Sequence, residues 1–293
     1  MHKIKHCRIA ERKALRLKLV SRSVSTRKGV SKRVRAVSTS QLVKTRFEEA
    51  LILPPIMRKD FKENKNSHCP VYYEGGVPVE NELLMKVANK TLTKEELHQK
   101  VKQDFDLLPV LLEGVSSPKA IVRYGCAKVL MDLSEEYPEK LYPHMDAFIG
   151  LLDSKYRILT WNAMAIIANL AKVDKDQKFD AIFNKYYGFL NNEYMVTVAN
   201  VVGNSGKIAL AKPHLLHKIT AELLKVENLS VTPHLTEECK RVITEKAIET
   251  FDLFFDKIEE KEKKKVLSFV ERQLDSSRRT LRTKAAAFLK KRR

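Results

Sequence analysis

Glycine and proline are scarce in this sequence, with nine glycines and ten prolines among 293 residues. Lysine, glutamate, leucine and alanine are plentiful instead, and all four favour helices. Few turn-forming residues beside many helix formers argue against a sheet-rich fold. Hydrophobic residues make up 44 % of the chain, which is enough for a sizeable core. We therefore expect an all-α protein with one large domain or two ordinary ones.

Cysteine is also rare, and the four cysteines, at positions 7, 69, 126 and 239, form no CxxC motif. Scattered cysteines in a chain of this length favour a reducing compartment over a disulfide framework. No run approaches the roughly 18 apolar residues that a membrane helix needs. The basic start also lacks the apolar stretch of a secretory signal. We expect a cytoplasmic protein without a membrane span.

Motifs that mark the common enzyme classes are missing as well. The sequence contains no HExxH, GxSxG, P-loop or GxGxxG pattern. The glycines of VVGNSGK, residues 201–207, have the wrong spacing for a phosphate loop and fall in a helical pattern. The two His-Cys pairs, at 6–7 and 68–69, lie in weakly structured segments and make a poor metal site. We therefore expect no catalytic residue, no metal ion and no cofactor.

Positive charge is plentiful but unevenly distributed. The formal net charge is +19, of which residues 1–46 contribute +14 and residues 278–293 contribute +8, leaving −3 for residues 47–277. An anionic partner would therefore meet the ends of the chain. The alternative is that both ends are solvated tails without a partner.

The basic segment 1–46 is open to three interpretations. Its Arg, Lys, Ser and Thr content is typical of an organelle transit segment, which would change the expected compartment. It also suits a basic arm for nucleic acid. In the third interpretation, translation begins at Met57 or Met85 and the segment has no evolved structure. In each case we expect a disordered basic arm over residues 1–56.

A junction is expected over residues 57–90, before the main helical region at 91–293. PVYYEGGVPV, residues 70–79, places two short β-prone runs around a Gly-Gly pair and predicts a hairpin. Beyond the junction, Thr93 and Glu96 form a capping-box pattern that predicts a helix start. Ser117 followed by Pro118 predicts a second start, and Pro138 ends that helical pattern.

The main region repeats itself. VRYGCAKVLMDL (122–133) aligns without a gap to LTWNAMAIIANL (159–170), and similar copies are TVANVVGNSGKI (197–208), ITEKAIETF (243–251) and LRTKAAAFL (281–289). A small residue anchors each copy, at spacings of 37, 38, 46 and 38, in the order Cys126, Ala163, Val201, Ala247 and Ala285. A period near 40 with two helices per unit predicts an α-solenoid, in which stacked units bury a continuous core.

These copies resemble the HEAT-repeat family, which is armadillo-like. The pattern of that family appears in Val122-Arg123, Cys126 and Leu130, and again in Leu281-Arg282, Ala285 and Leu289, with turn aspartates at Asp153 and Asp275. Thr160 and Thr244 stand where the family has arginine. The resemblance covers residues 91–293 and implies a right-handed α-solenoid of about five two-helix repeats.

The stretch LLDSKYRILTWNAMAIIANLA, residues 151–171, holds the only tryptophan of the chain. Leu159, Ala163 and Ile166 form its buried stripe, and Trp161 lies off that stripe. In HEAT-like solenoids the second helices line the concave surface. We therefore expect the concave partner-binding residues to be Tyr124, Trp161, Asn162 and Arg123. The alternative is that the two rings pack between repeat units.

The C-terminal segment RRTLRTKAAAFLKKRR combines an apolar stripe with a basic face. It predicts a capping helix whose outer side is polar because nothing stacks on it. The sharper alternative is contact with an anionic partner, nucleic acid or a membrane surface, through Arg278, Arg279, Arg282, Lys290 and Lys291.

The function that these patterns favour is a non-catalytic scaffold or adaptor that binds a protein or peptide partner on its concave face. The alternative is a nucleic-acid-associated HEAT-like protein. The resemblance admits one enzyme class within it, the DNA glycosylases that remove alkylated bases, for which Trp161, Tyr124 and Arg123 would line the groove. The oligomeric state stays open.

Overall fold

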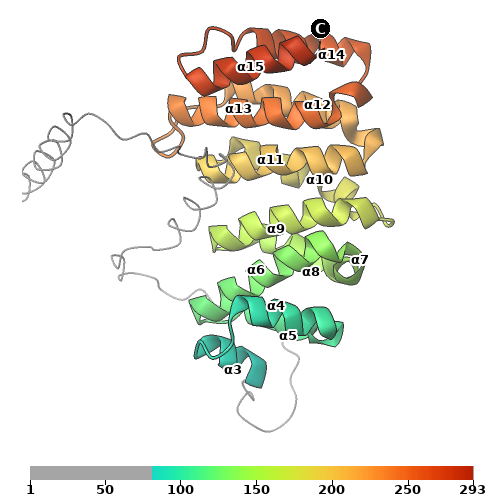
Figure 1. Ribbon diagram of the computed structural model, residues 1–293, viewed down its shortest axis with the longest axis vertical. Coiled ribbons are helices and arrows are strands. Elements are labelled where there is room, and N and C mark those ends of the chain that lie inside the picture. The colour runs from blue at the N-terminus through green and yellow to red at the C-terminus, as the bar shows by residue number, and fades with distance from the viewer. Residues whose placement is uncertain (1–80, 293) are drawn as a thin grey trace, which may run out of the picture. The chain divides into compact units, whose positions relative to one another are not determined.

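Residues 81–292 are described by a computed structural model of the chain (Figure 1). The basic arm, the hairpin expected at 70–79 and both His-Cys pairs lie outside these residues. Within them the chain is helical, and its only β-type pairing is an isolated bridge between Thr232 and Leu235. The all-α prediction is confirmed.

Five two-helix units follow one another along the described residues, and each contributes one helix to each of two layers. The first-helix layer contains α5 (Leu108–Val115), α8 (Met145–Gly150), α10 (Lys178–Gly188), α12 (Leu216–Leu224) and α14 (Glu260–Glu271). The second-helix layer contains α6 (Ala120–Glu136), α9 (Arg157–Leu170), α11 (Met195–Ala211), α13 (Glu237–Phe254) and α15 (Arg279–Arg292). Figure 1 shows the second helices stacked in chain order, each packed on the next. Stacking of this kind is the predicted α-solenoid.

Shorter elements complete the array. The helices α3 (Glu82–Ala88) and α4 (Lys94–Gln103) pack against the first unit, and α7 (Pro138–Leu141) precedes α8. Single 3-10 turns follow or precede most first helices, at Phe105–Leu107, Tyr142–His144, Leu151–Asp153, Ala171–Val173, Phe189–Asn191, Pro213–Leu215, Lys225–Asn228 and Phe255–Lys257. The capping box at α4 is formed as predicted, because the Thr93 amide donates to Glu96 at 2.8 Å and the Glu96 amide donates to the Thr93 hydroxyl at 3.2 Å.

In the turn before α6, the structure differs from the helix start that the sequence predicted at Ser117. The helix α6 begins at Ala120, two residues later than the Ser-Pro pattern predicted. The Ser117 hydroxyl instead accepts a hydrogen bond from the Lys119 amide at 3.2 Å. The same side-chain turn recurs in three other units, where the accepting residues are Ser154, Asn192 and Ser276. This turn competes with helical bonding, so the helix starts beyond it.

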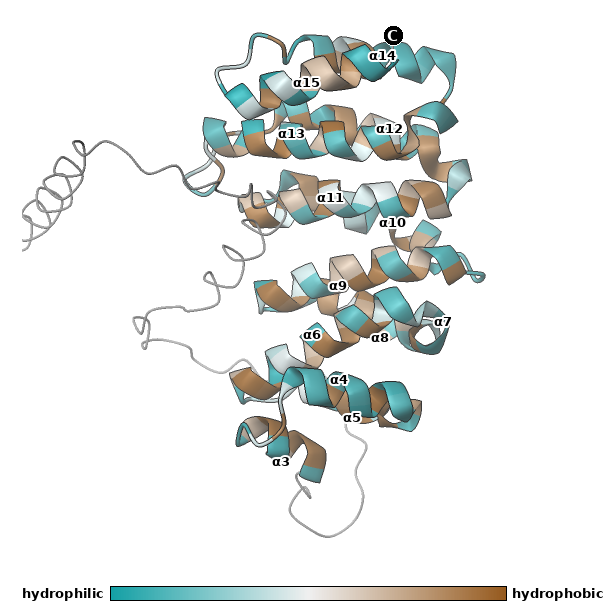
Figure 2. Cartoon of the chain, in the orientation of Figure 1, coloured by the Kyte–Doolittle hydropathy of each residue, from teal (hydrophilic) through white to brown (hydrophobic). Residues whose placement is uncertain are grey.

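The five small anchor residues are fully buried, which confirms the repeat register read from the sequence. Figure 2 shows hydrophobic residues alternating with polar ones along each helix, as an amphipathic layer requires. The weakest copy, with Gly203 and Gly206, is nevertheless an unbroken helix of 17 residues. A Cβ at Gly206 would lie 2.5 Å from a methyl of Leu253, so this glycine lets α13 approach closely.

One spacing between anchors is 46 residues rather than 37 or 38, and the extra residues lie between α12 and α13. This insertion packs back on the preceding unit. The Thr232 hydroxyl donates to the carbonyl of Glu193 at 2.8 Å, and the ring of His234 stacks on Tyr194 with centroids 4.6 Å apart. The guanidinium of Arg157 also lies on Tyr194, 3.9 Å from its ring centre.

A buried ionic cluster joins the second, third and fourth units. The Lys212 ammonium lies 2.9 Å from a carboxylate oxygen of Asp174, and both side chains are buried. Asp174 also accepts from the Tyr142 hydroxyl at 2.9 Å and from the backbone amides of Lys178 and Phe179 at 2.9 Å. Burial, together with hydrogen bonds to the carboxylates of Asp174 and Asp176, raises the pKa of Tyr142 to about 12. A buried pair is tolerated here because the lone pairs of Asp174 are satisfied.

Candidate functional site

Arg123 lies at the N-terminal end of α6 and is enclosed by the array. Its guanidinium sits 3.8 Å from the ring centre of Tyr156 and 4.8 Å from that of Tyr124. It donates to the carbonyl oxygens of Ser117 at 2.8 Å and Pro118 at 3.3 Å. Only 6 % of Arg123 is exposed. The side chain therefore joins the first two units through a cation–π contact and a bond to the turn.

Tyr124 and Trp161 occupy equivalent positions one unit apart, and each is half-buried against the unit that follows. The ring of Tyr124 meets Tyr156 edge-on, with centroids 6.4 Å apart. The indole nitrogen of Trp161 donates to the Thr197 hydroxyl of α11 at 3.0 Å. The structure thus gives each ring its own partner in the next unit rather than bringing the two rings together. Contact of either ring with another protein stays a prediction.

Asn169 explains why a buried helix holds a polar residue near its end. Its amide nitrogen donates to the Ser134 hydroxyl of α6 at 2.9 Å. Its amide oxygen accepts from the Lys207 ammonium of α11 at 2.8 Å, and the same ammonium reaches Glu135 of α6 at 2.8 Å. One chain of hydrogen bonds therefore spans three consecutive second helices. It lies close to the C-terminal ends of α6 and α9.

Three other asparagines on α9 and α11 keep free hydrogen-bonding capacity. Asn162 and Asn200 stand 38 residues apart, one on each helix, and Asn204 follows one turn later. The side-chain nitrogens of Asn200 and Asn204 donate to the carbonyl oxygens of Val196 and Asn200, at 2.8 and 2.9 Å. Their amide oxygens, and the whole Asn162 amide, have no partner among residues 81–292. This row offers acceptors to a further molecule.

Two leucines farther toward the C-terminus, one on α11 and one on α13, are also exposed. Leu210 of α11 is 41 % exposed and Leu253 of α13 is 57 % exposed, although both are large apolar side chains. Leu253 rests against Gly206, so the two helices meet where the leucines emerge. We call Asn162, Asn200, Asn204, Leu210 and Leu253 the second-helix face. It combines hydrogen-bond acceptors with apolar contact area.

Two of the basic residues predicted to meet an anion, one directly before α15 and one near its end, are already paired. Arg278 binds Glu238 and Glu245, the latter at 2.9 Å. Lys291 lies 2.8 Å from Asp252. These pairs dock α15 on α13.

The other three predicted anion contacts differ from one another. Arg282 donates to the Ser276 carbonyl at 2.5 Å, which repeats the role of Arg123 in the first unit. Arg279 and Lys290 are exposed, and no acidic residue in the described part of the chain pairs with either. Contact with an anion stays a prediction for these two.

The basic and hydroxyl partners at the α13–α15 interface lower the pKa values of its acidic residues. Burial alone would raise the pKa of Glu245, but hydrogen bonds from Thr280, Arg278 and Lys284 outweigh it and hold the pKa below its usual range. The same competition lowers the pKa of Glu249, with Lys284 as the chief partner. The interface is therefore charged at neutral pH on both sides.

Groups with obvious reactivity are few in this part of the chain. Burial raises the pKa of the Cys126 thiol to about 12, which keeps it protonated and inert. No group of three or more His, Cys, Asp or Glu residues between positions 81 and 292 is placed to hold a metal ion. None of the helices in that range combines the length and apolar character that crossing a membrane takes. The arrangement is suited to binding through hydrogen bonds and apolar contact.

Sequence reasoning singled out Asn162 but missed Asn200, Asn204 and the two exposed leucines. A signal existed for Asn200, since it falls at the repeat position of Asn162. Asn204, Leu210 and Leu253 carry no such signal, because their exposure depends on how α11 and α13 pack.

Comparison with models of protein families finds no match, and comparison with curated proteins finds none either. Solved structures do match. A designed armadillo repeat protein in complex with the peptide (KR)4 is 17 % identical, covers 74 % of this chain and 95 % of its own, and superposes with a TM-score of 0.54.

A second designed armadillo repeat protein is 17 % identical over 73 % of this chain and 93 % of its own, with a TM-score of 0.48. Computationally designed armadillo repeat proteins for modular peptide recognition are 18 % identical over 72 % and 90 %, with a TM-score of 0.47. Helices stacked in two layers, a buried small residue in every unit and the first of these likenesses lead to one conclusion. The chain has the fold of a HEAT- or armadillo-like α-solenoid.

Proposed function

We propose that this chain is a non-catalytic scaffold that binds an extended segment of a partner protein along the second-helix face. The observation that carries the proposal is the row of unpartnered amide oxygens on α9 and α11. A polypeptide in extended conformation has free backbone N–H groups along its length, and these are the donors that such acceptors bind.

The dimensions of the array suit such a segment. Packed helices lie about 8–10 Å apart, and an extended chain advances about 3.3 Å per residue. Two or three residues of the partner therefore pass each unit. A segment that meets α9, α11 and α13 needs on the order of eight residues.

The exposed leucines indicate the kind of side chain that the bound segment has at one end. Leu210 and Leu253 stay partly in water in the free protein. An apolar side chain of the partner would remove that area from water at about 25 cal/mol per Å². We therefore propose a segment with an apolar residue near α11 and α13 and hydrogen bonds to its backbone near α9.

The structural neighbour solved with a peptide supports the coarser part of this proposal. That neighbour is a repeat protein of this fold in complex with a peptide, (KR)4. The identity of the partner of the present chain rests on its own side chains.

Contacts within the repeat array support a non-catalytic role. The three residues that a base-removing enzyme would use are engaged elsewhere: Arg123 is buried, Trp161 bonds Thr197 and Tyr124 packs on Tyr156. The proposed compartment is the cytoplasm, which the scattered cysteines of the sequence favour.

The test selects peptides from a displayed library of random dodecapeptides against the full chain. Selected peptides are synthesised and their dissociation constants measured by fluorescence anisotropy. The triple variant Asn162→Ala/Asn200→Ala/Asn204→Ala should lose about 10-fold or more in affinity, since each hydrogen bond contributes about 0.5–1.5 kcal/mol.

The matched control removes three exposed amides from the other side of the units, as Asn184→Ala/Asn191→Ala/Asn228→Ala. It should bind like the unaltered chain. The proposal fails if no peptide is enriched, or if both variants lose affinity to the same extent.

A further inference from the structure

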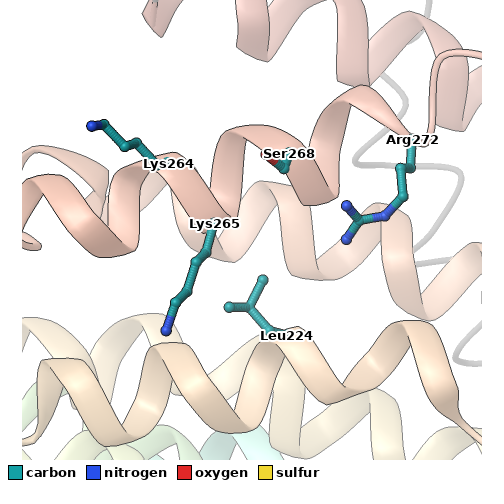
Figure 3. A pocket seen from close by; sticks show the side chains of 5 residues that line it. All are labelled: Leu224, Lys264, Lys265, Ser268 and Arg272. Carbon is teal, nitrogen blue, oxygen red and sulfur yellow. The ribbon is translucent and has the colours of Figure 1, made fainter.

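A cleft opens in the first-helix layer between α12 and α14. It has a volume of about 400 Å³ and is lined by Leu224, Lys264, Lys265, Ser268 and Arg272. Figure 3 shows Lys265 and Arg272 on either side of Leu224, with Ser268 between them along α14. Lys264 is directed away from Leu224, along the outer side of the helix. Every polar group that lines the cleft is a hydrogen-bond donor, and a serine hydroxyl is both donor and acceptor.

The donors in this cleft are largely unused. Arg272 binds Glu227 through Nε and one terminal nitrogen, both at 2.7 Å, which fixes the guanidinium and leaves its other terminal nitrogen free. Lys265 and the Ser268 hydroxyl have no partner in the part of the chain that the structure describes. The acidic group at the rim, Glu227, therefore orients one cation and neutralises neither lysine.

The cleft continues as a basic stripe along α14. Lys261, Lys265, Ser268 and Arg272 are all exposed, at spacings of three or four residues that place them on one side of the helix. From first to last they span about 16 Å at 1.5 Å per residue. Lys261 also lacks an acidic partner within residues 81–292. Glu260 at the start of the helix is paired with Lys263 at 2.8 Å.

The contrast with α15 is direct. The sequence made α15 the more basic segment, yet Arg278, Lys284, Lys291 and Arg292 are paired with acidic residues of α13. On α14 the sequence mixes acids and bases, but the helix turns the unpaired lysines to one side. Lys261 and Lys265 of α14 therefore present unpaired positive charge on one side of the helix.

We propose that this stripe, with the α12–α14 cleft at its centre, binds the phosphate backbone of a nucleic acid. Ammonium, guanidinium and hydroxyl groups are the side chains that contact phosphate oxygens. A stripe of about 16 Å faces several successive phosphates, since one strand of a duplex carries one charge every 3.4 Å or so. Leu224 is the only apolar residue lining the cleft, so the surface offers little to insert into a lipid layer.

Binding of this kind is independent of sequence. The stripe holds no side chain positioned as a pair of donor and acceptor to read a base edge. It lies in the first-helix layer, whereas the proposed peptide face lies in the second-helix layer, so either site can be tested without the other.

The experiment measures binding of the full chain to a fluorescein-labelled single-stranded 20-nucleotide DNA by anisotropy, over a series of KCl concentrations. The variant Lys261→Gln/Lys265→Gln removes two cations from the stripe without breaking an ion pair. Its affinity at 0.1 M salt should fall about 10- to 30-fold, and the slope of log K against log salt should become shallower by about 1.4.

The matched control, Lys94→Gln/Lys175→Gln, removes the same charge from two exposed positions outside α14 and α15 that form no ion pair within the described residues. It leaves the basic N-terminal segment in place, as the stripe variant does, and should change affinity less than threefold. Circular dichroism melting confirms that both variants fold.

Three results would overturn the proposal. The two variants could lose affinity equally, which would mean that only net charge matters. Alternatively, both variants could keep their full affinity, which would place binding outside α14. Vesicles of phosphatidylserine and phosphatidylcholine could bind through the stripe while the oligonucleotide does not, which would assign the surface to a membrane.

Discussion

The second helices are joined differently in the two halves of the array. Between α6, α9 and α11 the links are mostly neutral: the Trp161 indole on Thr197, the Asn169 amide on Ser134 and the edge-on ring pair that Tyr124 forms. Between α13 and α15 they are ion pairs. The same repeat geometry is thus held by two kinds of chemistry.

The position of α15 explains the difference. No described helix packs on its far side, so it buries a narrower stripe, chiefly Leu281, Ala285 and Phe288, than a helix inside the array. Charged residues on a terminal repeat keep its outer side in water. On the inner side they find the acids of α13. Exposed ion pairs contribute little each and are screened by salt, so the C-terminal end should be the easier end to loosen.

The sharpest test of this comparison removes one partner of the buried ionic cluster in the better-held half. Lys212→Met leaves Asp174 charged and buried without its ammonium, which should lower the free energy of unfolding by about 3–5 kcal/mol. Urea denaturation measures it. The control, Lys185→Met, breaks the exposed pair with Asp153 and should cost under about 1 kcal/mol. Equal losses would show that burial does not separate the two pairs.

Glycine substitutions compare packing within the first unit with packing between α11 and α13. A Cβ at Gly114 would lie 2.5 Å from the sulfur of buried Cys126, so Gly114→Ala should cost about 1–3 kcal/mol. At Gly206 the obstacle is the end of Leu253, which is exposed and can rotate away. Gly206→Ala should therefore stay within about 1 kcal/mol of the unaltered chain, helped by better helix propensity. Thermal melting distinguishes the two, and the reverse order would contradict the packing described.

Trp161→Phe sharpens the role of the single tryptophan. Loss of the hydrogen bond to Thr197 should lower the free energy of unfolding by about 0.5–1.5 kcal/mol. If Trp161 serves packing between units, affinity for a selected peptide should change little. A large loss of peptide affinity with unchanged stability would instead support the aromatic partner site predicted from the sequence.

Lowering the pH should weaken the docking of α15 on the array before it affects α9. Of the changes described here, it should have the smallest effect on the free energy of global unfolding. The pKa values of Glu245, Glu249 and Asp252 are lowered in the folded protein. A carboxyl with a lowered pKa adds stability above its unfolded pKa, about 4.3 for Glu and 3.9 for Asp, and loses it as the pH falls through the folded value.

Hydrogen exchange of α15 amides should therefore rise relative to α9 as the pH falls below about 4, after correction for intrinsic exchange rates. Salt at 1 M and neutral pH should produce a change in the same direction, because the Debye length shrinks to about 3 Å. Protection of α15 that holds under both conditions would mean that its apolar stripe alone docks it.

Much of the fold could be predicted because it depends on local sequence patterns. The repeat register, the small anchors and the capping box at Thr93 each follow from residues close in sequence or at a fixed period. The start of α6 was placed wrongly because a Ser117 side-chain turn and a helix cap look alike in one dimension. Recognising the turn needed its recurrence at Ser154, Asn192 and Ser276, which a single unit does not show.

The candidate sites could be predicted less well from the sequence. Asn169 and Asn162 lie seven residues apart on one helix and read alike, yet Asn169 is tied to α6 and α11 while Asn162 is free. Which asparagine is available depends on side chains 35 and 38 residues away. Lys207 reaches Glu135 across 72 residues, a distance at which no sequence period indicates contact.

What the sequence by itself determined is the architecture: helical periodicity, a small residue at each anchor and a period near 40 leave stacked two-helix units as the way to bury the apolar stripes. What only the tertiary structure decided is which polar groups stay free. Charges and amides on neighbouring helices meet when the units stack, so Lys284, Lys291 and Arg292 of α15 pair with acids of α13, while Lys261 and Lys265 of α14 stay unpaired within the described residues. Burial follows from the pattern of one helix, but availability follows from the side chains of the next.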